Sequence, residues 1–325
     1  MSVSAWMYIY ASSNGPQVES AESIITIPSG TSMRGIAAIL GNAGIIDNDI
    51  RFLFLAKWLG VAGKLRAGEF RVPTGMTPVE VLKMLVKAKV VQHAITIPEG
   101  LNAQEIAQIF SERGWGNSET YGSLIHDKAF IESLGITGIT SLEGYLYPDT
   151  YYLTREIRTA EEIITLQVRR FQEVWGELVK DMSPEPDMVN TVILASMVEK
   201  ETGSSPERPL IASVFKNRLR KGMRLQSDPT VVYGVAGYSG VITRKHLKTP
   251  TPYNTYVIEG LPIGPIANPG REALHAVLFP ATSKFLYFVS KNDGTHQFST
   301  NLKDHNRAVR KYQRKKENKN GKEKS

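Results

Sequence analysis

The residues best suited to chemistry lie in the stretch Asp187–Gly203, DMVNTVILASMVEKETG. Prolines punctuate its start and a glycine closes its end, which is the pattern of a single helix. On a helical wheel Glu201 falls within the apolar stripe, and Glu199 falls roughly opposite it because residues i and i+2 lie about 200° apart. The stripe consists of Val189, Ile193, Leu194, Met197 and Val198. We therefore expect a solvated Glu199 and a half-buried Glu201, which do not form one catalytic pair.

Glu201 has the position expected of a general acid. It lies in the last turn of the expected helix, near the negative end of the helix dipole. Burial and the dipole both disfavour a carboxylate, so both should raise the pKa of Glu201. A carboxyl group that stays protonated near neutral pH can donate its proton to a leaving group. The alternative is a helix-end glutamate that pairs with a nearby arginine and has no chemical role.

Three polar, proline-rich loops follow this helix, at Arg224–Gly234, Thr251–Tyr256 and Gly260–Gly270. Proline removes backbone freedom, so we expect these loops to be rigid. Their short polar groups suit hydrogen bonds to a neutral polyol, and they are Gln226, Ser227, Asp228, Tyr253, Asn254, Thr255 and Asn268. The sequence has neither a glycine-rich loop with lysine nor clustered histidines, so we expect no cofactor and no metal.

Length and charge bound the remaining possibilities. The chain of 325 residues is long enough for two or three domains, and it contains no cysteine, which excludes disulfides and thiolate metal sites. The net charge is +7, but residues 310–325 hold eight Lys/Arg against two acids. This basic tail therefore carries +6, and residues 1–309 carry only +1. Because the body has no nucleic-acid-binding motif, we expect no nucleic-acid partner.

A strand–turn–helix unit recurs in the first third of the chain. Residues 25–44 align without a gap with residues 95–114, and a weaker copy begins at Phe70. In each copy a Pro-x-Gly turn separates a β-rich run from an amphipathic helix. A further helix at Asp47–Leu59 gives the order β-α-α-β for Ile25–Val72, with the helices on one face of two strands. This module lacks clustered acids, so we expect a binding or spacer element, with pure scaffold as the alternative.

The start of the chain and its other helices complete the expected layout. Val3–Ala11, VSAWMYIYA, is apolar but far too short for the roughly 20 residues of a membrane span, so residues 1–24 are interpreted as a stub and linker. Further helices are expected at Lys128–Ser133, Thr159–Lys180 and from Ser205 to Gly222.

Five motifs together resemble the endolytic murein transglycosylase family, the YceG-like proteins. They are SMVEKET, FKNRLRKGMRLQSDPTVVYG, TPYNTY, GLPIGPIANPG and LYFVSKNDGTHQFSTNLKDHN, and the resemblance covers roughly Ile25 to Arg310. The family's Glu-Thr pair matches Glu201-Thr202, so the resemblance carries the catalytic role over to Glu201 and not to Glu199. Asn217, inside the second motif, joins the loop residues as a substrate-binding candidate.

The resemblance implies a lytic transglycosylase that acts on peptidoglycan glycan strands. Glu201 would protonate the β-1,4 bond between N-acetylmuramic acid and N-acetylglucosamine, then deprotonate the muramic 6-hydroxyl, which closes a 1,6-anhydro ring. Ordinary glycosidases need two carboxylates, whereas this reaction needs one because water is not the nucleophile. The resemblance also implies a role in terminating nascent strands or setting their length, beside peptidoglycan synthases. The family carries a membrane helix that places the catalytic domain outside the cytoplasm, in the periplasm, and we expect this anchor to be truncated here.

The expected fold is α+β: a LysM-like β-α-α-β module at residues 25–92, a mixed α+β catalytic domain at residues 93–309 with a buried helix carrying Glu201, and the basic tail. Two other functions stay open. A non-catalytic glycan-binding scaffold of cell-wall synthesis would keep the polar loops and use Glu201 as an ion-pair partner. A pyridoxal-phosphate-dependent lyase would need a Schiff-base lysine and a phosphate cradle, and Lys200 has no such cradle in the sequence.

Overall fold

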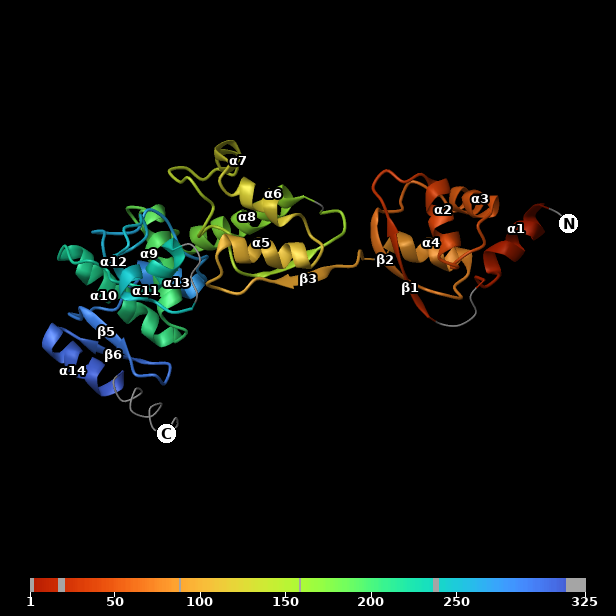
Figure 1. The fold of residues 1–325 in the computed structure, drawn as a ribbon. Coiled ribbons are helices and arrows are strands. Elements are labelled where there is room, and N and C mark those ends of the chain that lie inside the picture. Colours follow the sequence, from red (N-terminus) through yellow and green to blue (C-terminus); the bar gives the residue numbers. More distant parts are fainter. Residues whose placement is uncertain (1–2, 17–20, 88, 158, 236–239, 314–325) are drawn as a thin grey trace, which may run out of the picture. The chain divides into compact units, whose positions relative to one another are not determined.

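The computed structural model describes residues 3–16, 21–87, 89–157, 159–235 and 240–313, and it has an α+β fold. The chain divides into two compact units, whose elements Figure 1 labels. Unit 1 comprises residues 1–95 and 150–158, and unit 2 comprises residues 96–149 and 159–325.

Unit 1 is built on an antiparallel pair of strands, β1 (Glu22–Ile27) and β2 (Gly68–Pro73), with Ile25 opposite Phe70. Helices α2 (Met33–Asn42) and α3 (Ile50–Trp58) connect the two strands, which confirms the expected β-α-α-β order. Helix α4 (Pro78–Lys87) follows β2. The core between these elements is apolar and includes Leu40, Phe52, Leu55, Phe70 and Leu82.

The three Pro-x-Gly turns need glycine for a conformational reason. Gly30, Gly75 and Gly100 have φ angles of 76°, 81° and 79°, in the left-handed region that side chains disfavour. Each glycine precedes a helix: α2, α4 and α5 (Ala103–Glu112). The repeated sequence pattern therefore corresponds to a repeated backbone turn, as expected.

The apolar start of the chain belongs to the core of unit 1. Residues Val3–Ser12 form helix α1, which packs against α3 and α4, and the ring of Tyr10 is buried. Arg51 of α3 lies over this ring, 4.4 Å from its centroid. None of the helices within the described ranges is both long and apolar enough to cross a membrane.

Unit 2 consists mainly of helices joined by long ordered loops. Helices α6 (Ser118–Leu124), α7 (Lys128–Ser133) and α8 (Ala160–Val179) follow α5, and α8 begins at the N-cap Thr159 as expected. Strands β3 (His93–Thr96) and β4 (Thr150–Leu153) form a second two-stranded sheet, whose residues belong to unit 1 except for Thr96. The remaining helices are α9 (Met188–Glu201), the 3-10 turn η1 (Ser205–Glu207), α10 (Arg208–Arg220), α11 (Asp228–Gly234), α12 (Arg244–Lys248) and α13 (Arg271–Leu278).

Helix α9 is the central helix of unit 2. It packs against α10, α11 and α13, and every residue from Thr191 to Val198 is buried. The sequence predicted a single apolar stripe, but neighbours surround this helix on all sides. This arrangement fixes the direction in which each side chain of its last turn points.

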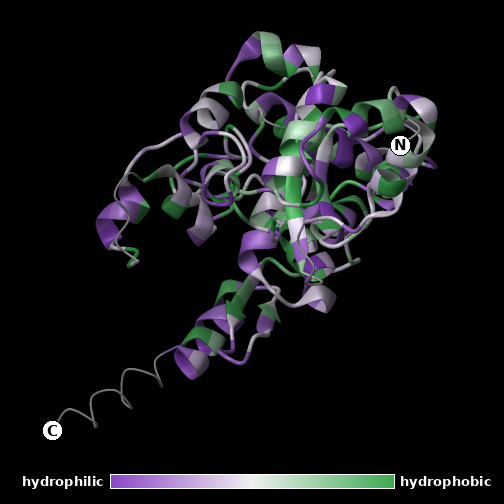
Figure 2. Ribbon diagram, turned by 90° about the vertical axis from the view of Figure 1, so that its right-hand side faces the viewer, coloured by the Kyte–Doolittle hydropathy of each residue, from purple (hydrophilic) through white to green (hydrophobic). Residues whose placement is uncertain are grey.

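The end of the described chain is a hairpin and a helix. Strands β5 (Tyr287–Ser290) and β6 (His296–Ser299) pair in antiparallel fashion, and α14 (Leu302–Tyr312) packs against both. Helix α14, next to the C-terminal end in Figure 2, is largely hydrophilic, and Ala308 is its buried residue. Most of the predicted basic tail, residues 314–325, lies outside the described residues.

Candidate active site

Glu201 ends α9 and contacts the loop that leads into α11. Its Oε1 atom accepts a hydrogen bond of 2.5 Å from the hydroxyl of Ser227, which is almost completely buried. The residue itself is half-buried, as the sequence predicted. Two residues that are 26 positions apart in the sequence therefore meet at the C-terminal end of the central helix.

A small hydroxyl network fixes Ser227 in place. The backbone N–H of Ser227 donates to Oγ1 of Thr255 at 3.0 Å, and the hydroxyl of Thr230 donates to the carbonyl of Ser227 at 2.6 Å. The two threonine hydroxyls lie 2.8 Å apart, and both residues are fully buried. Because backbone and side-chain bonds both hold Ser227, its hydroxyl is preorganised toward Glu201.

The surroundings of Glu201 favour the protonated acid. Burial raises the pKa of this carboxyl to about 7, and the neighbouring carboxylate of Asp228 adds to the rise. The hydrogen bond from Ser227 and the positive charge of Arg218 act in the opposite direction. Near neutral pH the group is therefore poised between acid and base forms, which is the state that general acid–base catalysis requires.

Glu201 lines a cavity of about 870 Å³ whose walls are mainly polar. The cavity lies between the end of α9, the Leu225–Asp228 loop, the β5–β6 hairpin and α14. Its other lining side chains that can form hydrogen bonds are Thr202, Arg218, Gln226, Asp228, Tyr256, Ser290, His296, His305 and Gln313. This volume and this wall suit a polar ligand of several rings better than an apolar one.

Several side chains of the cavity wall were not among the candidates from the sequence, and Arg218 and Tyr256 are two of them. Arg218 is buried, donates from Nε to the carbonyl of Leu286 at 2.6 Å, and lies over the ring of Tyr287. Tyr256 donates its hydroxyl to Oδ1 of Asp228 at 2.6 Å, which holds that carboxylate at the cavity wall. Arg218 lies within the motif FKNRLRKGMRLQSDPTVVYG and Tyr256 within TPYNTY, but neither has a spacing that marks it as functional.

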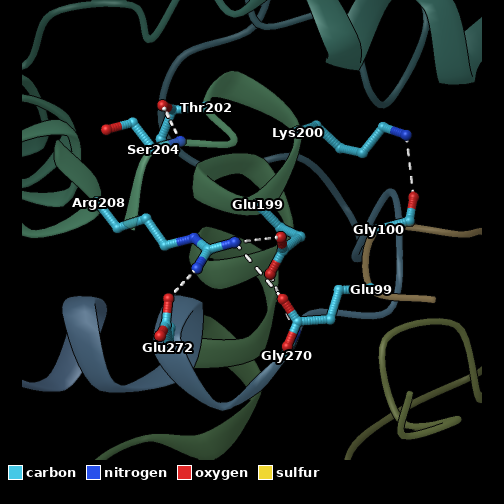
Figure 3. A network of polar contacts seen from close by, with 9 residues as sticks. All are labelled: Glu99, Gly100, Glu199, Lys200, Thr202, Ser204, Arg208, Gly270 and Glu272. Carbon is cyan, nitrogen blue, oxygen red and sulfur yellow. Dashed lines mark hydrogen bonds and ion pairs between the residues drawn. The ribbon is translucent and has the colours of Figure 1, made fainter. Parts of the chain in front are cut away.

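Glu199 contradicts the sequence prediction of a solvated side chain. Only 5% of its side chain is exposed, and Oε1 accepts a hydrogen bond of 2.9 Å from Nη2 of Arg208. Figure 3 shows this arginine between Glu99, Glu199 and Glu272, while Lys200 reaches the carbonyl of Gly100. The prediction is wrong because α9 has packed neighbours on every side. The structural ion pair considered for Glu201 is instead made by Glu199.

The predicted substrate-binding residues fall into two groups. Gln226, Ser227 and Asp228 lie at the Glu201 carboxyl or its cavity. Gln226 adopts a φ of 50°, and its N–H donates to the carbonyl of Thr255 at 3.1 Å. Asn217, Tyr253, Asn254, Thr255 and Asn268 lie outside the residues that line this cavity.

This second group forms bonds within the protein. The Nδ2 atom of Asn217 donates to the carbonyls of Ser283 and Phe285, and that of Asn254 donates to the carbonyl of Thr249 at 2.7 Å. Oδ1 of Asn268 accepts from two backbone N–H groups, and the ring of Tyr253 packs against Tyr233. Their direct contact with a substrate stays a prediction, whereas their positioning of the loops is visible.

Within the described ranges, no group of three or more acidic or histidine side chains is arranged to hold a metal ion. The fold and the site thus define an α+β protein with a half-buried, ionisable carboxyl at a large polar cavity. The chain belongs to the YceG-like family, whose model matches residues 25–311.

Relatives of the chain include proteins named endolytic murein transglycosylase. An endolytic murein transglycosylase of Bacillus subtilis is 32% identical over 303 residues, which cover 89% of this chain and 84% of that protein. A Streptococcus pneumoniae protein of the same name is 29% identical, over 88% of this chain and 57% of its own length. Among solved structures, a yceG-like protein from Listeria monocytogenes matches with a TM-score of 0.59 and 31% identity, over 89% of this chain and 99% of that one.

Proposed function

We propose that this protein is an endolytic peptidoglycan lytic transglycosylase and that Glu201 is its acid and base. The observation that carries the proposal is a half-buried glutamate of raised pKa, hydrogen-bonded to a preorganised serine at the wall of a polar cavity. The names of its relatives support the same activity. The substrate is a glycan strand, cut at the β-1,4 bond between N-acetylmuramic acid and N-acetylglucosamine.

Glu201 acts twice in the proposed reaction. In its protonated form it donates the proton to the glycosidic oxygen, and the bond between that oxygen and the anomeric carbon breaks. The resulting carboxylate then removes the proton of the muramic 6-hydroxyl, whose oxygen bonds to the anomeric carbon and closes the 1,6-anhydro ring. The electron pair of the broken bond stays with the departing oxygen, the 6-oxygen supplies the pair of the new bond, and its proton returns to Glu201, so Glu201 ends as it began and water takes no part.

The neighbours of Glu201 suit these two half-reactions. The Ser227 hydroxyl occupies Oε1, which leaves the other carboxyl oxygen for proton transfer. The buried charge of Arg218 favours the carboxylate that exists between the two steps. Asp228, held by Tyr256, supplies negative charge beside the developing oxocarbenium ion.

Asp228 also gives a rival mechanism a physical basis. A hydrolase uses one carboxyl as acid and a second carboxylate as nucleophile or as base toward water, and Asp228 lines the same cavity as Glu201. Reaction of purified glycan strands in ¹⁸O-water separates the two. A transglycosylase gives unlabelled 1,6-anhydro ends by mass spectrometry, and label at the muramic end would establish hydrolysis. Products from neither route would favour the non-catalytic glycan-binding scaffold.

In the cell we propose that the enzyme terminates nascent strands or sets their length, beside peptidoglycan synthases, from the outer face of the inner membrane. Unit 1, with its β-α-α-β order, serves as a LysM-like glycan-docking module. Deletion of residues 25–89 should then slow the cutting of long strands at least tenfold more than that of short fragments. Equal loss on both substrates would make the module scaffold only.

A further inference from the structure

A second cavity, of about 660 Å³, lies in unit 2 beside the one that contains Glu201. It is bounded by the start of α5, the loops at residues 125–126 and 141–143, the end of α9 and one side of α11. Glu201 does not line this second cavity. The wall residues that matter for its chemistry are Gln104, His126, Glu143, Lys200, Asp228 and Tyr233.

The two cavities share a wall. Asp228, the first residue of α11, lines both of them. The last turn of α9 also serves both, because Lys200 lines the second cavity and the next residue, Glu201, lines the first. In Figure 3 Lys200 extends toward Gly100, on the opposite side of the helix from Arg208. The two cavities therefore both lie at the last turn of α9 and at the first residue of α11.

One wall of the second cavity contains a hydrogen-bond network centred on Glu143. This residue is 5% exposed, and both of its carboxyl oxygens lie 3.1 Å from the backbone N–H of Ala103. Asn268 donates to it from Nδ2 at 2.8 Å and Tyr233 from its hydroxyl at 3.0 Å. Burial raises the pKa of Glu143 to about 7, so the wall does not present a permanent full charge near neutral pH.

The other walls have the mixed character of a sugar site. Tyr233 brings an aromatic ring, held edge-on against Tyr253 at 4.8 Å, and Ile125, Val232 and Ile266 bring apolar surface. Gln104 and His126 add polar groups that are exposed at the wall. A pyranose has apolar ring faces and a hydroxyl rim, so it matches a wall of this composition better than a wholly apolar or a strongly charged ligand does.

We propose that this second cavity is a saccharide subsite that holds the glycan strand away from the bond at which Glu201 acts. The ligand class is a hexosamine unit of the same polymer. This inference rests on the proposed function, since an enzyme that cuts within a strand must bind sugars beyond the broken bond. It also gives Asn268 and Tyr253 an indirect role, because both support residues of this wall rather than of the Glu201 cavity.

The absence of cysteine from the sequence allows a direct test. Gln104→Cys and His126→Cys each place a single thiol on an exposed wall position of the second cavity, outside the Glu201 cavity. A bulky methanethiosulfonate reagent then obstructs the cavity and is removed by reductant. Lys221→Cys, exposed at the end of α10 and absent from the residues that line either cavity, is the matched control. All three are made in the Glu201→Gln background, and calorimetry measures binding of glycan oligosaccharides of two to eight sugars.

Labelling at position 104 or 126 should weaken binding of the six- and eight-sugar ligands at least tenfold, leave the two-sugar ligand within twofold, and be reversed by reductant. The label at position 221 should change neither. Equal affinity for long ligands with and without the label would overturn the subsite while leaving the proposed function intact. Failure of the unlabelled protein to bind any glycan would overturn the proposed function and the subsite together.

Discussion

The hydroxyl of Ser227 donates a hydrogen bond of 2.5 Å to Oε1 of Glu201, and this contact couples the loop before α11 to the end of α9. It acts against burial, because a donor to the carboxylate lowers the pKa that burial raises. The pair thus sets both the direction and the ionisation of one carboxyl group.

Removal of the Ser227 hydroxyl should move the pH profile of activity upward. Ser227→Ala loses a bond that favours the carboxylate, so the pKa of Glu201 rises further and the alkaline limb of kcat shifts up by about one pH unit. Ser213→Ala, whose hydroxyl contacts Ser283 outside the cavity, should leave the midpoint in place. Initial rates on glycan strands across pH 5–9 measure it, and a downward shift would contradict the assignment.

The two glutamates at the end of α9 should separate activity from stability. Glu201→Gln should lower kcat by about 10²–10⁴, the usual contribution of a general acid. Glu199→Gln removes the buried negative charge that pairs with Arg208. The substitution should therefore lower the free energy of unfolding by about 1–3 kcal/mol and leave kcat within a few-fold. Product release and urea denaturation give the two readouts. The opposite pattern of effects would reject Glu201 as the acid.

The pKa of Glu201 also predicts a pH-dependent stability difference. The pKa of this carboxyl has an ordinary value of 4.5, and burial in the folded protein raises the pKa to about 7. The contribution of the protonated group to the free energy of unfolding is therefore fully present below about pH 4.5 and is lost as the pH rises through about 7. The full difference corresponds to about 3 kcal/mol. Glu201→Gln cannot ionise, so its stability relative to the unmutated protein should increase from pH 4.5 to pH 8. Glu143 is common to both proteins and cancels in this comparison. A difference independent of pH would mean that the carboxyl is not desolvated.

Substitutions at Gly144 and Gly222 should show how tightly the backbone around Gly144, which donates a hydrogen bond to Asn268, is packed. Both glycines have positive φ, 90° and 65°, so an alanine at either position costs about 1–2 kcal/mol of backbone strain. A Cβ at Gly144 would also lie 2.6 Å from Pro265 and 2.8 Å from Val192, whereas Gly222 has open space. We therefore expect Gly144→Ala to destabilise unit 2 by about 1–3 kcal/mol more than Gly222→Ala does. Urea denaturation of the two variants measures the difference, which would vanish if the backbone around Gly144 relaxes freely.

Local sequence signals were sufficient for much of the fold. The Pro-x-Gly turns, the helix limits at Thr159 and Gly222, and the β-α-α-β order depend on backbone preferences that act over a few residues. The same is true of the half-buried position of Glu201 in the last turn of α9. The apolar stripe and the helix end can both be predicted from the local sequence, without knowledge of the elements that pack against the helix.

The sequence by itself therefore determined the Pro-x-Gly turns, several helices and the half-buried position of Glu201, because each follows from interactions between positions close along the chain. The tertiary structure decided which polar groups face a ligand. Glu199 is tied to Gly270, 71 positions away, and Asn268 to Glu143, 125 positions away. A helical wheel assigns Glu199 to solvent because it contains one helix only, whereas burial depends on every element packed around that helix. Hydrogen-bond partners so distant in sequence are specified by the packing of whole elements, and no local pattern encodes them.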